Sequence, residues 1–87
     1  PVYALGDLCP QLGNKVWVAP NATVIGNVHL ADNVSIWWNA TVRGDTAPIF
    51  IEADTNIQDN SVLHVADTPL RIGKAVTVAA SGAISYA

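Results

Sequence analysis

The sequence is poor in charge and contains a single cysteine. Only 13% of its 87 residues are charged, and four basic side chains against seven acidic ones leave a net charge of −3. A negatively charged chain with four basic side chains lacks the positive patch that binds a phosphate backbone, so we do not expect nucleic acid as a partner. Cys9 has no second cysteine with which to form an intrachain disulfide, which favours a reducing, cytoplasmic location.

Long apolar runs are also missing. No stretch approaches the roughly 18 consecutive apolar residues of a membrane span, so we expect no membrane partner. The first residues are interrupted by Gly6, Asp7 and Pro10 and do not resemble a signal peptide. Hydrophobic residues nevertheless make up 51% of the chain. For one small domain with so few charges, we therefore expect much apolar surface to be covered by self-association.

Aliphatic residues recur every six positions in three runs. Six residues advance a helix by roughly 240°, which scatters the repeated positions over several faces and excludes an amphipathic helix. In an extended chain the same residues all point one way, because six is an even number. These anchors are Val18, Val24, Leu30, Ile36 and Val42, then Ile51, Ile57 and Leu63, then Ile72, Val78 and Ile84.

Short strands with one apolar side can bury that side by stacking into a solenoid. The period therefore predicts a single all-β domain, with a parallel β-helix of about four triangular coils over residues 16–87 after an N-terminal segment over residues 1–15. The anchors Val42, Leu63 and Ile84 are each 21 residues apart, which is one 18-residue coil plus three. Both three-residue insertions follow such an anchor, so the two loops should lie one above the other at one corner.

Stacking also predicts which outward side chains meet between coils. Arg43, His64 and Ser85 each follow one of these anchors and should form one column. Trp38, Asp59 and Ala80 form a second column in the same way. Trp37 and Trp38 are too large for the inside of a narrow coil and are expected at a corner or at a subunit contact.

Three motifs on this repeat resemble the γ-class carbonic anhydrases, a group within the hexapeptide-repeat transferase superfamily. They are "VRGD" (42–45), "TNIQDNSVLH" (55–64) and "PLRIG" (69–73). The resemblance implies a left-handed β-helix that assembles as a homotrimer, with an intersubunit zinc ion held by three histidines. Because the relatives continue for several coils and a C-terminal helix, the resemblance also implies a C-terminally truncated chain. The open edge of its last coil predicts either end-to-end association of trimers or a frayed final coil.

The resemblance assigns the candidate site residue by residue. His64 matches the first zinc ligand, but the other two ligand positions are Ala80 and Ser85, so we expect a degenerate site. Arg43 and Asp45 match the family's structural arginine and aspartate, and their pairing is expected to lock the corner or the interface. The family's polar residues near bound water and substrate match Asn56, Gln58 and Asp59, which would be vestigial catalytic residues here.

Three functions from different classes remain open at this point. The favoured one is a non-catalytic trimeric scaffold or binding module without a cofactor, because one imidazole does not provide the roughly three protein ligands of a catalytic zinc. The second is an active, zinc-dependent carbonic anhydrase that hydrates CO₂. The third and weakest is a hexapeptide-repeat acyltransferase. His29 is expected near an outward corner and is not expected to bind a metal.

Overall fold

A computed structural model describes residues 1–79 and 83–86, and this part of the chain forms strands without any helix. In it, no helix long and apolar enough to cross a membrane is found. The eleven strands are β1 (Val2–Tyr3), β2 (Gln11–Leu12), β3 (Trp17–Val18), β4 (Thr23–Leu30), β5 (Ser35–Ile36), β6 (Thr41–Ile51), β7 (Asn56–Ile57), β8 (Val62–Val65), β9 (Leu70–Ile72), β10 (Thr77–Val78) and β11 (Ala83–Tyr86).

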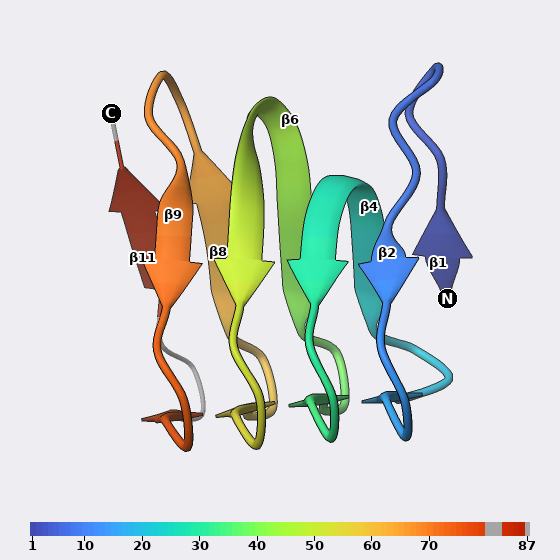
Figure 1. Ribbon diagram of the computed structural model, residues 1–87, viewed down its shortest axis with the longest axis vertical. Helices are drawn as coiled ribbons and strands as arrows, with labels where there is room; N and C mark the ends of the chain where they lie inside the picture. Colours follow the sequence, from blue (N-terminus) through green and yellow to red (C-terminus); the bar gives the residue numbers. More distant parts are fainter. Residues whose placement is uncertain (80–82, 87) are drawn as a thin grey trace.

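The strands pair in parallel between successive coils. One sheet has the order β1-β4-β6-β8-β11, with β2 joined to β4 and β9 joined to β6, and the other has the order β10-β7-β5-β3. Figure 1 shows the coils side by side, from the N-terminal coil in blue to the C-terminal coil in red. The predicted all-β, left-handed parallel β-helix of about four coils is therefore confirmed.

The predicted anchors form the core. Nine of the eleven anchors are buried, Val18 is partly buried in the first coil, and the side chain of Ile84 lies outside the described residues. Where the six-residue phase is unbroken, positions four residues after an anchor of the first run are buried as well, as alternation along an extended chain requires. The buried anchors are Val24, Leu30, Ile36, Val42, Ile51, Ile57, Leu63, Ile72 and Val78, and the other positions include Ala22, Val28, Val34 and Ala40.

Two of the three corners turn through residues in the left-handed backbone conformation. At the first of these, Lys15, Asn33, Asp54 and Ala75 have φ values of 57°, 61°, 62° and 53°. The backbone N–H of each of the last three donates to a carbonyl of the coil below. Asparagine and aspartate tolerate this conformation because their short polar side chains can hydrogen-bond locally.

At the remaining corner the strands are continuous, unlike the short strands predicted from the six-residue period. β4 and β6 bend through it without interruption and arch over the top of Figure 1. Here Gly26, at φ 85°, lies opposite Gly44. A Cβ atom on Gly26 would lie closer than 3.0 Å to the Gly44 carbonyl oxygen, and one on Gly44 would meet the Asn27 carbonyl group. The coils keep pairing around this corner because two glycines let their backbones approach closely.

The two insertions stack at this glycine corner, as predicted. Residues 43 and 49 of β6 pair with residues 64 and 70 of the next coil, so the intervening segments have equal length. The Thr46 hydroxyl donates to the carbonyl oxygens of Val65, at 3.1 Å, and Ala66. The hydroxyl group therefore ties the two loops together.

The N-terminal segment adds to the stack. β1 and β2 both pair with β4, although no hexad precedes residue 16. Between them the chain doubles back through an antiparallel bridge of Leu5 and Leu8. Residues 2–12 thus provide two sides of a first coil.

Candidate functional site

The column of Arg43, His64 and Ser85 is confirmed by the strand register. Arg43 of β6 pairs with His64 of β8, and His64 pairs with Ser85 of β11. The Arg43 Nη2 atom lies 2.9 Å from His64 Nε2. Asp45 lies beside both, with Oδ2 3.4 Å from Arg43 Nε and Oδ1 3.4 Å from His64 Nε2. We call Arg43, Asp45 and His64 the His64 site.

In the His64 site, the Nε2 atom of His64 takes part in a hydrogen bond with Arg43. A guanidinium group only donates, so the Arg43 contact requires Nε2 to accept and leaves the ring proton on Nδ1. Nε2 presents its lone pair to Arg43 in this arrangement. A metal ion bound through the same nitrogen would have to displace the guanidinium group.

Local hydrogen bonds also set the charge of Asp45. The Thr46 backbone N–H donates to Oδ1 at 2.8 Å, and this bond is the main cause that lowers the pKa of the Asp45 carboxyl below its ordinary value. Partial burial opposes the shift, whereas the Asp45 backbone N–H, His64 and Arg43 lower the pKa further. Asp45 is therefore held as a carboxylate beside the Arg43 guanidinium group.

The chain has two histidines, His29 and His64, so one chain alone does not provide a three-histidine zinc centre. Catalytic zinc uses three protein ligands and keeps one position open. The next position in the column of His64 is Ser85, and Ala80 lies outside the described residues. Among the described residues, no group of three His, Cys, Asp or Glu side chains could hold a metal ion. His64 is the one histidine at this corner in that part of the chain.

The three polar positions assigned from the resemblance lie apart from the His64 site within one chain. Asn56 begins β7 in the four-stranded sheet, and its Oδ1 accepts a hydrogen bond from Gln58 Nε2. The Asn56 Nδ2 atom donates to Thr77 Oγ1 at 3.3 Å. Asp59 follows at the next corner. Among the described residues, no hydrogen bond or ion pair joins these three to His64.

The second histidine has a different environment. His29 Nε2 lies 2.9 Å from Asn27 Oδ1, and the ring stacks on Phe50 with centroids 4.7 Å apart. Arg71 lies over the Phe50 ring, 4.5 Å from its centroid, and pairs with Glu52 at 3.2 Å. His29 thus lies at the surface near the end of β4, where its ring packs on Phe50.

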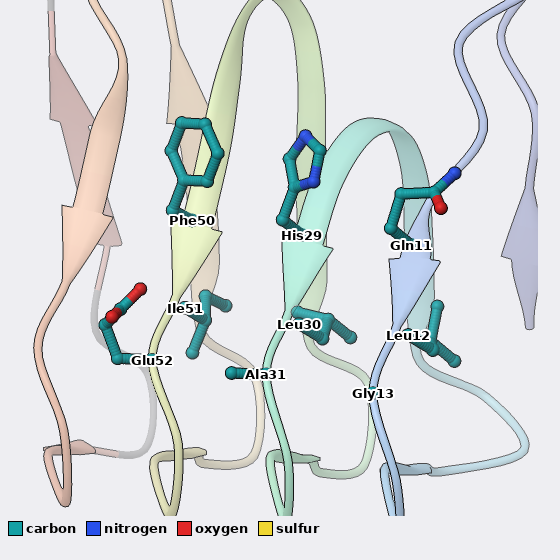
Figure 2. Close-up of a pocket in the computed structure, with 9 residues that line it drawn as sticks. All are labelled: Gln11, Leu12, Gly13, His29, Leu30, Ala31, Phe50, Ile51 and Glu52. Carbon is teal, nitrogen blue, oxygen red and sulfur yellow. The ribbon is translucent and has the colours of Figure 1, made fainter.

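Sequence reasoning missed a hollow beside His29. It has a volume of about 240 Å³ and lies on the outer surface of β2, β4 and β6. Figure 2 shows Gln11, His29 and Phe50 along one side, with the small residues Gly13 and Ala31 in the lower part. The only signal in the sequence is that Gln11, His29 and Phe50 each precede an aliphatic residue of the same face.

Comparisons with known proteins agree with this architecture. A family model for the bacterial transferase hexapeptide (six repeats) matches residues 10–44. Protein YrdA of Escherichia coli (strain K12) is 46% identical over 80 residues, which cover 83% of this chain and 44% of that protein. Gamma carbonic anhydrase 2, mitochondrial, of Arabidopsis thaliana is 42% identical over 85 residues, which cover 90% of this chain and 31% of that protein.

A solved structure extends the agreement to three dimensions. The crystal structure of a hexapeptide transferase family protein from Anaplasma phagocytophilum matches with a TM-score of 0.86 and 34% identity, over 97% of this chain and 49% of that chain. The chain thus spans less than half the length of each of these three proteins. The hexad repeat, the stacked register and these matches show that the chain belongs to the γ-carbonic anhydrase-like hexapeptide-repeat family.

Proposed function

We propose that this chain is a non-catalytic, γ-carbonic anhydrase-like β-helix that serves as a self-associating scaffold or binding module. The observation that carries the proposal is the composition of the His64 column. The coil after His64 has Ser85 in register, and Arg43 donates to the imidazole nitrogen that faces it. The side chains of the His64 site therefore stand in the column that the coil register predicts, and their contacts are with one another.

The remaining interactions of the His64 site support a structural role. Arg43 bridges β6 to His64 in the next coil, and Asp45 holds the guanidinium from the same strand. A planar guanidinium group suits such a fixed arrangement because its N–H groups point in defined directions. The proposed role of Arg43 and Asp45 is to fix the glycine corner and the surface that it presents to a second copy.

The assembly proposed here is the homotrimer that the family resemblance implies, in the cytoplasm and without a cofactor. Its support is the low charge of the chain, since 51% hydrophobic residues and 13% charged ones leave apolar surface to be covered. In such a trimer each intersubunit site receives one His64, with Ala80 and Ser85 at the other two ligand positions.

An active zinc-dependent carbonic anhydrase is the second candidate. The names of the plant relative and of a Geobacillus kaustophilus relative, which is 40% identical over 78 residues, favour it. In that case zinc would lower the pKa of a bound water and supply hydroxide for CO₂ hydration. His64 is the residue of this chain that would contribute to holding the ion.

Metal content and CO₂ hydration of the purified chain test the proposal. We expect well under one zinc per chain by mass spectrometry after dialysis against zinc, and hydration no faster than the buffer blank. The double variant Ala80→His/Ser85→His restores the missing imidazoles and is expected to bind zinc, whereas Ala80→Gln/Ser85→Gln is its matched control. Stoichiometric zinc with hydratase activity in the unmodified chain would establish the second candidate instead.

A further inference from the structure

Four flat side chains stand in one outward column beside the hollow described above. The strand register places Gln11, His29, Phe50 and Arg71 opposite one another in successive coils. The imidazole of His29 is stacked on the Phe50 ring at an interplanar angle of 17°, and Arg71 from the following coil lies over the same ring. The stack ends at His29, because Gln11 turns away from the imidazole in Figure 2. The imidazole face that Phe50 does not cover therefore borders the hollow.

The hydrogen bonds of Gln11 and His29 leave acceptor atoms beside the hollow. Gln11 Nε2 donates to the Cys9 carbonyl oxygen at 3.2 Å, which leaves Oε1 as an acceptor. His29 Nε2 lies 2.9 Å from Asn27 Oδ1. Since an amide oxygen accepts, this contact places the imidazole proton on Nε2 and makes Nδ1 an acceptor. Within the described part of the chain, no hydrogen bond engages either acceptor atom.

Two carboxylates also lie at the hollow. Glu52 lines it directly. Asp32 lies over Gly13 in the floor, since a Cβ atom on Gly13 would be 2.5 Å from Asp32 Oδ1. The same oxygen accepts a hydrogen bond from the Asn14 backbone N–H at 2.8 Å, which holds this carboxylate in place. No lysine or arginine is found among the described residues that line the hollow. A ligand that fits should therefore supply N–H groups and positive charge.

Arg71 shows how a guanidinium group binds to this surface. It lies 4.5 Å from the centroid of the Phe50 ring and pairs at 3.2 Å with Glu52, two residues after Phe50. The other end of the stack has the same combination, because the open imidazole face of His29 is accompanied by Asp32, three residues further along the chain. Flat, delocalised cations are weakly hydrated and stack on rings while they donate to carboxylates, so both contacts can form together.

We propose that the hollow beside His29 binds a small, flat organic cation of the amidinium or guanidinium class. The flat group rests on the open face of His29, and its N–H groups donate to Asp32 and to Gln11 Oε1. A volume of about 240 Å³ suits a fragment-sized molecule, since it lies below the roughly 300–1,000 Å³ of pockets for larger ligands. Leu12 and Leu30 line the hollow and provide apolar contact. The site and the His64 site lie on opposite sides of the glycine corner, so binding here is independent of the proposed scaffold role.

Benzamidine is a suitable probe, and benzamide, which has the same shape without the charge, is its control. Each compound is titrated into the isotope-labelled 87-residue chain and followed by two-dimensional NMR. We expect saturable shifts of the backbone amide signals of Gly13, His29 and Ala31, with half-saturation at about 1–10 mM benzamidine, as suits so small a ligand. Benzamide should need at least fivefold more. Equal binding of both compounds would overturn the requirement for a cation, and an absence of saturable shifts at these residues would overturn the site.

Two pairs of variants test the site from the side of the protein. Ala31→Leu fills the hollow and is expected to raise the half-saturation concentration of benzamidine at least tenfold. Ala66→Leu makes the same change in an insertion loop outside the hollow and should alter it less than twofold.

Asp32→Asn removes one negative charge while Oδ1 can still accept from the Asn14 backbone. We expect at least threefold weaker binding of benzamidine. Asp67→Asn removes the same charge from an insertion loop and should change binding less than 1.5-fold. Circular dichroism melts verify that each variant is folded. Equal effects within either pair of folded variants would contradict the inference.

Discussion

The corners of this solenoid are built in two different ways. At two corners the chain turns through single residues in the left-handed conformation, such as Asn33 above Lys15 and Asn60 above Asn39. At the glycine corner β4 and β6 bend without interruption while their backbones approach closely. The insertions and the His64 site lie at this second kind of corner. The two left-handed corners thus maintain the six-residue repeat, whereas the glycine corner carries the side chains of the His64 site.

The two kinds of corner differ in what limits the residues that each can accept. A left-handed turn depends on one residue's backbone energy, so many residue types are tolerated at a modest cost. A close approach of two coils depends on space between backbones, which does not relax easily. Substitutions should therefore have larger effects at the glycine corner than at the other two.

The largest effect is expected for Gly44→Ala. The added Cβ would lie closer than 3.0 Å to the carbonyl group of Asn27, and the coils would have to separate where they are otherwise paired. We expect a loss of about 3 kcal/mol in the free energy of unfolding, measured by urea denaturation.

Gly73→Ala is the control for Gly44→Ala, because a Cβ at Gly73 would have no neighbour within 4 Å. It should leave stability unchanged or raise it by up to about 1 kcal/mol through the entropy of the unfolded chain. If both alanine variants lose equal stability, close packing is not what distinguishes the glycine corner.

A smaller effect of opposite sign is expected for Ala75→Gly at a left-handed corner. Ala75 has a φ of 53°, a conformation that costs a residue with a Cβ about 1–2 kcal/mol. Glycine relieves this cost but loses about 0.5–1 kcal/mol of chain entropy, so a net gain of about 0.5–1 kcal/mol is expected in thermal or urea unfolding.

Ala53→Gly provides the comparison for Ala75→Gly. Ala53 lies in the equivalent turn of the preceding coil but does not have a positive φ. Glycine there should destabilise the fold by about 0.5–1 kcal/mol. Destabilisation by both substitutions would mean that Ala75 carries no strain.

The smallest effect concerns pH and the His64 site. The lowered pKa of Asp45 means that the folded chain holds the carboxylate more firmly than the unfolded chain does. Its contribution is fully present above the ordinary carboxyl pKa of 3.8 and is lost as the pH falls through the lower folded value. Asp45→Asn should therefore cost about 0.2–1 kcal/mol at pH 7 and less at pH 3, in urea titrations at both pH values. An equal loss of stability at pH 7 and pH 3 would show that the charge of Asp45 does not stabilise the corner.

Much of this fold was predictable because the repeat determines it. The period of six places Val24, Val42 and Leu63 inside and fixes the coil length, and equal gaps between anchors predict the stacked insertions. Columns follow from the coil length, which is why the meeting of Arg43 with His64 could be predicted from the sequence alone.

Other features escaped prediction because they depend on contacts between coils rather than on the period. Nothing in the sequence before residue 16 repeats, yet β1 and β2 pair with β4 because the open edge of that strand offers backbone partners. The continuous bend of β4 and β6 depends on the mutual approach of Gly26 and Gly44. The separation of Asn56 and Gln58 from the His64 site follows from their different sheets.

The stacked insertions have a consequence for how this chain tolerates changes of length. β6 carries three extra residues relative to β4, and the difference is absorbed by an irregularity between Gly26 and Val28. β6 and the following coil have loops of equal length, and their pairing needs no such irregularity. The pairing around the corner is thus regular only where the two adjacent coils have loops of equal length. An insertion or deletion is accommodated most easily when the adjacent coil changes by the same number of residues.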